Sequence, residues 1–212
     1  MIGLIGKKIG MSQVFAPDGT LIPVTIIQAG PCTVVQKKTI QRDGYTALQL
    51  GFGTQKLQRA KKPLVGHCKK ANAAPVSVLR EFRTGDVDQY EIGSALTVAS
   101  LFQAGEIVDI IGRTKGRGYA GVIKRHGMSG FPGTHGTHEY FRHGGSIGNR
   151  SFPGRIFKGK RMAGQYGNDC MTALHLRVVE VRADENLLFI RGAVPGARGG
   201  VVLVRKTEAG KK

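Results

Sequence analysis

Acidic residues are scarce in this sequence. Of its 212 residues only 14 are Asp or Glu, against 32 Lys and Arg, so the formal net charge is +18. Net charge indicates partners more than fold, and a surplus of this size favours a polyanionic partner. The candidates are nucleic acid, an anionic membrane surface and an acidic protein.

Cysteine is also rare, with Cys32, Cys68 and Cys170 far apart and no C-x-x-C pair. An odd number of dispersed cysteines argues against a disulfide scaffold and a structural zinc site, and it fits a reducing compartment. We expect three ordinary, partly buried thiols.

Long apolar runs are missing as well. No stretch approaches the ~18 apolar residues that a membrane-spanning helix needs. The first residues, MIGLIGKKIGMSQVF, place two lysines after a short apolar run. This order is the reverse of a secretory signal. The sequence therefore predicts no membrane association and a cytoplasmic location.

What the chain does contain is a series of short, β-rich apolar runs separated by turn residues. Such runs predict strands joined by hairpins, and a series without helical periodicity favours a barrel or sandwich over alternating βαβ units. We expect an all-β dominated barrel that uses both ends of the chain, with a basic, partly helical insertion at about 54–75. The predicted strands are 11–15, 21–29, 32–39, 45–53, 76–83, 95–102, 106–113, 172–182, 187–194 and 201–206.

The segment 112–168 has a different composition. It holds 11 of the 32 basic residues, 15 of the 32 glycines, four of the six histidines and one acid, Glu139. It also holds seven Phe and Tyr residues. Such a segment cannot bury enough apolar surface to offset its ordering entropy.

Folded RNA can supply the missing core of this segment. Basic side chains match phosphates, aromatic rings stack on unpaired bases, and glycines permit close backbone approach. The alternative is a flexible loop whose charge serves solubility, but the near-absence of acids disfavours it.

Two enzyme signatures also fall in this segment. Gly116, Gly118 and Gly121 spell G-x-G-x-x-G after a strand-like run, but a dinucleotide site also needs a βαβ unit and a well-placed acid. The nearby serines lack a G-x-S-x-G elbow, and the region lacks a carboxylate cluster. We therefore expect no catalysis and no small-molecule substrate.

Histidines at His135, His138 and His143, with Glu139, raise the possibility of a metal site. Their spacing matches no standard zinc pattern. We predict no metal and no cofactor, and we expect these histidines to stack on bases or donate to phosphates.

Four blocks carry a resemblance to a known family: MIGLIGKKIGMSQVF, GRTKGRGYAGVIKRHG, GGSIGNRSFPGRIFKGKRMAGQYGN and NLLFIRGAVPGARGG. In this order, from Met1 to about Arg205, the chain resembles the bacterial large-subunit ribosomal protein L3 (uL3) family. The resemblance implies a closed six-stranded Greek-key β-barrel of the translation-protein type, with a small α/β insertion and a long irregular central extension. It also implies direct 23S rRNA binding, early subunit assembly, proteins L14 and L19 as neighbours, and no catalytic residues.

Under this resemblance the chain divides into residues 1–112, the first part of the barrel domain, 113–168, an rRNA-penetrating loop, and 169–212, the rest of the barrel and a short polar tail. The loop tip, expected near the peptidyl-transferase centre, comprises Ser146, Asn149, Arg150, Ser151 and Phe152. Asn149 stands where some relatives carry a methylated glutamine, so that modification is not expected. The predicted rRNA-binding residues are Arg113, Lys115, Arg117, Lys124, Arg125, His126, Arg142, His143, Arg150, Arg155, Lys158, Lys160 and Arg161.

Overall fold

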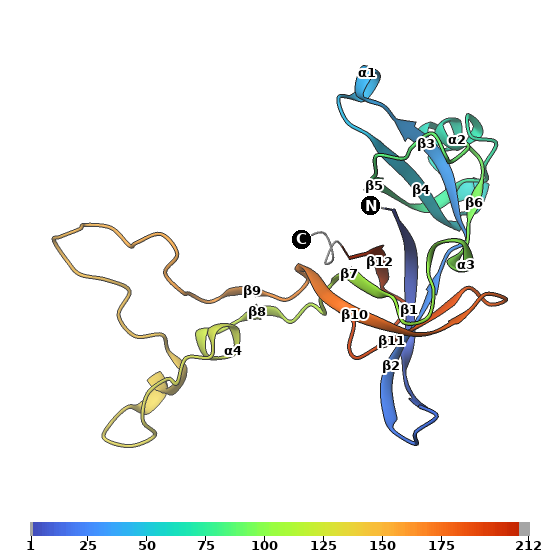
Figure 1. The fold of residues 1–212 in the computed structure, drawn as a ribbon. Helices are drawn as coiled ribbons and strands as arrows, with labels where there is room; N and C mark the ends of the chain where they lie inside the picture. Colours follow the sequence, from blue (N-terminus) through green and yellow to red (C-terminus); the bar gives the residue numbers. More distant parts are fainter. Residues whose placement is uncertain (1, 208–212) are drawn as a thin grey trace. The chain divides into compact units, whose positions relative to one another are not determined.

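Six strands close into an antiparallel barrel in the computed structural model, which describes residues 2–207. The order around the barrel is β1-β12-β7-β10-β11-β2, and β2 pairs back with β1 (Figure 1). The predicted all-β dominated fold with a closed six-stranded barrel is confirmed. The barrel strands are β1 (Gly3–Phe15), β2 (Leu21–Ala29), β7 (Ile107–Arg113), β10 (Cys170–Arg182), β11 (Leu187–Arg191) and β12 (Val201–Lys206).

Buried side chains from several barrel strands form the core. Leu4, Ile27, Ile110 and Leu188, from four different strands, are fully buried. Glycine is required where β1 meets β12, because a Cβ at Gly3 would press into the Val204 carbonyl oxygen and the Phe82 ring. A closed barrel of this kind has no unpaired edge strand.

A second sheet follows β2 in the chain, with strand order β5-β4-β3-β6. Its side chains Leu48, Leu50 and Phe82 join the same apolar cluster as Leu4 of the barrel, so the two sheets share one core. The basic segment 54–75 connects β4 to β5. The elements of this part are β3 (Cys32–Lys38), α1 (Ile40–Asp43), β4 (Ala47–Thr54), η1 (Leu57–Arg59), α2 (Lys62–Lys69), β5 (Val76–Arg83), β6 (Ala95–Leu96) and α3 (Val98–Leu101).

The strands predicted at 21–29, 76–83 and 201–206 have the bounds that the sequence indicated. The strand predicted at 95–102 is wrong, since only Ala95–Leu96 is extended and Val98–Leu101 is helical. Val98, Leu101 and Phe102 are all buried, at a spacing that one helical turn satisfies. Over so short a run, the apolar pattern does not distinguish the two-residue period of a strand from the 3.6-residue period of a helix.

Residues Thr114–Asp169 form a compact unit separate from the rest of the chain. It contains β8 (Gly118–Ala120), α4 (Val122–His126), η2 (His138–Arg142) and β9 (Gly164–Tyr166). Arg113 and Cys170, on either side of it, are paired residues of β7 and β10. Of the polar tail predicted at the C-terminus, residues 208–212 lie outside the described part of the chain. None of the helices between residues 2 and 207 combines the length and apolarity needed to traverse a bilayer.

The three thiols differ in accessibility, which gives a direct chemical prediction. Cys32 and Cys68 are buried and Cys170 is exposed, and burial raises the pKa of the Cys32 thiol to about 11. Because the thiolate is the reactive form, the folded protein should titrate one thiol rapidly with an aromatic disulfide reagent at pH 8. The same protein in guanidinium should titrate three. Rapid reaction of all three in the native protein would contradict the packing of Cys32.

Candidate nucleic-acid interface

The unit 114–169 has almost no core of its own. Among its residues only Ala120 and Val122 are buried. Val122 begins α4, and the glycine at 144 lies against its side chain. Two small apolar side chains cannot offset the ordering entropy of a segment this long.

A short antiparallel ladder, which we call the neck, joins the two arms of this unit. Its strands are β8 and β9, and the Arg117 amide donates to the Tyr166 carbonyl at 2.8 Å. The helix α4 follows β8 and ends at Gly127, whose φ of 69° is a left-handed conformation that favours glycine. The neck is the most regular part of the unit.

Arg125 and His126 bind the opposite arm of the loop. The Arg125 guanidinium donates to the Met162 carbonyl oxygen at 2.8 Å, and His126 Nε2 lies 3.0 Å from the same oxygen. A Cβ at Gly164 would lie 2.7 Å from the Arg125 guanidinium, so glycine leaves the space that this side chain occupies. Both residues therefore position the loop within the protein, whatever further contacts they make.

Beyond the neck, the segment 127–143 is held by a few local contacts. The Phe131 amide donates to the Phe141 carbonyl at 3.0 Å, and the rings of Tyr140 and His143 lie 4.7 Å apart between centroids. Within residues 2–207 no three His, Cys, Asp or Glu side chains come together as metal ligands. The partner of the His143 ring in this unit is the Tyr140 ring.

The tip consists of exposed turns. Ser146 Oγ donates to the Gly148 carbonyl at 3.1 Å, and Phe152 is 87% exposed. A shallow hollow of about 190 Å³ lies between the two sides of the tip. It is lined by Ile147, Gly148, Asn149, Arg150, Gly154, Arg155 and Ile156.

Most of the predicted rRNA-binding side chains point into solvent. Ten basic residues face only two acids in this unit, Glu139 and Asp169. None of the ion pairs described for residues 2–207 involves the unit. Arg113, which is also exposed, is the last residue of the barrel strand β7 and belongs to the other compact unit. The exposed basic residues are Lys115, Arg117, Lys124, Arg142, Arg150, Arg155, Lys158, Lys160 and Arg161.

The glycine motif at 116–121 does not form a dinucleotide site. β8 pairs with β9 in an antiparallel ladder, and the helix after it, α4, has five residues. A Rossmann site needs parallel strands joined by a crossover helix. Gly118 instead starts the neck with a φ of 68°.

Exposed aromatic rings are the feature that the residue-by-residue prediction underweighted. Tyr119 is 79% exposed, Phe157 64% and Tyr140 61%, although large rings are normally buried. The sequence predicted aromatic stacking for the segment as a whole and assigned only Phe152 to the tip. The exposure of Tyr119 could have been predicted, because its immediate neighbours in the sequence, a glycine and an alanine, are too small to pack against its ring.

Comparison with known proteins assigns the chain to a family. The Ribosomal protein L3 family model matches residues 85–186. The chain is 51% identical to the large ribosomal subunit protein uL3 of Syntrophobacter fumaroxidans over 208 residues, which is 98% of each chain. It is 50% identical to the uL3 of Thermotoga petrophila, over 99% of each chain, and of Petrotoga mobilis, over 100% of this chain and 98% of the relative. The chain therefore belongs to the ribosomal protein L3 family, a family of structural, non-enzymatic proteins of the large ribosomal subunit.

Proposed function

We propose that this protein binds 23S rRNA directly, helps to nucleate early assembly of the large subunit, and extends its central loop toward the peptidyl-transferase centre. It would act in the cytoplasm, beside the large-subunit proteins L14 and L19. The near-absence of a core in residues 114–169 carries the proposal. A conformation without a core becomes stable when a partner supplies buried surface, and the charge of this unit fits RNA.

The roles of the loop residues follow from their chemistry. Lys158, Lys160 and the exposed arginines neutralise phosphates and release counterions, which supplies affinity. Phe152 stacks on, or wedges between, unpaired bases at the tip. Arg125 and His126 hold the two arms together, so that both reach the RNA in one register.

Chemical footprinting of 23S rRNA tests the proposal. The purified full-length protein should protect a defined set of large-subunit rRNA nucleotides from hydroxyl radicals, and photo-cross-linking groups placed at Arg150 or Phe152 should label rRNA in intact subunits. Absence of the protein from ribosomal fractions at moderate salt would contradict the proposal.

Deleting residues 127–161 should remove most of the loop and leave the barrel folded. The barrel strands and their core lie outside this range, so the shortened protein should retain a cooperative thermal transition close to that of the full chain. Large-subunit assembly in cells that depend on the shortened protein should slow, with precursor particles visible on sucrose gradients. An unfolded shortened protein would contradict this division.

A further inference from the structure

The connection between β4 and β5 carries a second cluster of positive charge, in the barrel-containing unit rather than the loop. The segment 54–75 contains six basic residues and no Asp or Glu. All six side chains are exposed, and none takes part in an ion pair described for residues 2–207. These residues, which we call the α2 surface, are Lys56, Arg59, Lys61, Lys62, Lys69 and Lys70.

We infer that the α2 surface is a separate RNA-binding site, which contacts the phosphate backbone of duplex rRNA through a face of α2 formed by Lys62, Gly66 and Lys69. The loop 114–169 does not contain it. The choice of rRNA as the partner rests on the proposed function, whereas the existence and geometry of the surface do not.

The helical period places these three residues together. Lys62 and Lys69 are seven positions apart, almost two turns, so they lie on one face at a separation of roughly 10 Å. Gly66 lies between them on that face, and a Cβ built there meets nothing within 4 Å. Glycine inside a helix costs stability, so an outward-facing one that packs against nothing calls for another reason. A bare backbone flanked by two ammonium groups lets a phosphate chain approach closely.

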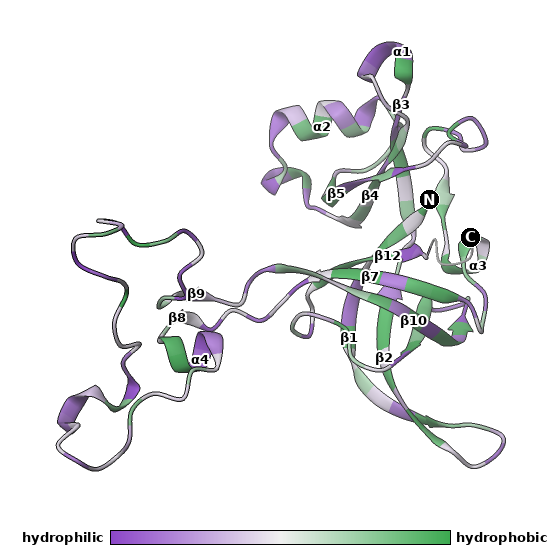
Figure 2. Ribbon diagram, turned by 60° about the vertical axis from the view of Figure 1, so that its left-hand side comes forward, coloured by the Kyte–Doolittle hydropathy of each residue, from purple (hydrophilic) through white to green (hydrophobic). Residues whose placement is uncertain are grey.

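The opposite side of α2 is fixed to the protein, which keeps the lysine face outward. Cys68 is fully buried and Leu64 is half-buried. Figure 2 shows hydrophilic and hydrophobic stretches alternating along the helix. The segment thus has a packed side and a charged side.

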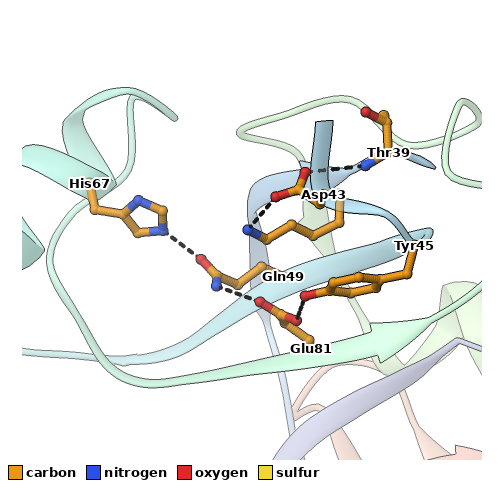
Figure 3. Close-up of polar contacts among 7 residues, drawn as sticks. Thr39, Asp43, Tyr45, Gln49, His67 and Glu81 are labelled. Atoms are coloured by element: carbon orange, nitrogen blue, oxygen red, sulfur yellow. Dashed lines mark hydrogen bonds and ion pairs between the residues drawn. The ribbon is translucent and has the colours of Figure 1, made fainter. Parts of the chain in front are cut away.

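A chain of hydrogen bonds, drawn in Figure 3, ties α2 to the sheet. His67 Nε2 donates to the side-chain oxygen Oε1 of Gln49, and the side-chain nitrogen Nε2 of Gln49 donates to the Glu81 carboxylate at 3.1 Å. The Tyr45 hydroxyl donates to the same carboxylate at 2.7 Å, which raises the pKa of that hydroxyl. One helix, β4 and β5 are thereby linked. The lysine face is pre-organised by this link, which lowers the ordering cost of binding.

The composition favours RNA over a protein partner. Protein interfaces are enriched in aromatic residues and depleted in lysine. The α2 surface has five lysines, one arginine and no aromatic residue. Lysine binds phosphate as a point charge, which suits contact with a backbone rather than with particular bases. An absence of aromatic rings also disfavours unpaired bases, which leaves the duplex.

Salt-dependent binding of the full-length protein to transcribed 23S rRNA tests the inference. The K62Q/K69Q variant should lower the slope of log Kobs against log salt by about 2, one unit per lost phosphate contact. Its hydroxyl-radical footprint should lose protections in duplex nucleotides while those from the loop persist. Gly66→Gln should keep or raise the thermal midpoint, because it removes a glycine from a helix, and it should still bind rRNA at least fivefold more weakly.

R42Q/R191Q is the matched control, because it removes two exposed charges from the same unit, outside the α2 surface. It should leave the slope within half a unit of the parent. An equal fall in the control, or an unchanged slope and footprint in K62Q/K69Q, would overturn the inference. Failure of the parent protein to bind 23S rRNA would instead count against the proposed function. If K62Q/K69Q binds RNA normally but no longer binds an acidic ribosomal protein, the partner of the α2 surface is that protein and not RNA.

Discussion

The R150Q/R155Q/K158Q/K160Q variant should lose most of its affinity for 23S rRNA. Four exposed cations in a unit with two acids would be removed. Each phosphate contact contributes about 0.7 to 0.9 to the salt slope, so the slope of log Kobs should fall by about 3. At 0.15 M salt this corresponds to a loss of affinity on the order of a hundredfold or more. Filter binding over a salt series measures both.

The control for this variant keeps the charge and changes the side chain, as in R150K/R155K/K158R/K160R. It should retain most of the slope, and the remaining loss of affinity reports on bidentate arginine contacts that lysine cannot make. Both variants should share the parent's thermal midpoint, because none of the four residues packs against the barrel core. A neutral variant that binds with the parent's slope would rule out the phosphate contacts assigned to this arm.

Replacing Ile110 with alanine should destabilise the barrel by about 2–5 kcal/mol, as for other buried isoleucines. Ile110 is fully buried at the centre of β7, opposite Ala173 on one side and Val204 on the other. Its loss leaves a cavity in the only part of the protein with a substantial core among the described residues. Urea unfolding followed by circular dichroism gives the change in free energy.

Ile107 provides the matched control, three residues earlier in the same strand and 46% exposed. Ile107→Ala should change the free energy of unfolding by less than about 1 kcal/mol. Hydrogen exchange in β8 and β9 should be the same in both variants, because the neck lies in the other compact unit. Equal destabilisation by the two substitutions would mean that β7 does not present Ile110 to the core.

The strands were predictable because their signals are local. Leu21–Ala29 and Val201–Lys206 are rich in β-branched residues and are bounded by turn residues or glycine, and each lies where the sequence indicated. The division between two sheets was not predictable in this way. Whether Leu48 joins the barrel or a neighbouring sheet depends on pairings distant in the chain, which no short window contains.

The candidate site also has features that the sequence predicts and features that it does not. Composition alone marked 112–168 as a segment without a core, because the excess of cations and glycine can be counted directly. The contact of Arg125 and His126 with the opposite arm could not be predicted, because it depends on the backbone carbonyl oxygen of Met162, and every residue carries such an oxygen. The number of charges is visible in a sequence, and the choice of hydrogen-bond partner is not.

The pairing of β12 with β1 has a consequence for the order in which the chain acquires structure during synthesis. Gly3 pairs with Arg205, so the barrel cannot close until residues near 206 have left the exit tunnel. Contacts this distant in sequence make folding slow. Until then β1 has an open edge on the side that β12 later covers. The basic loop has already left the tunnel, although the barrel that carries it has not yet folded. A nascent chain in this condition is exposed to misplaced nucleic-acid contacts and to aggregation, which predicts that it depends on a chaperone before it reaches RNA.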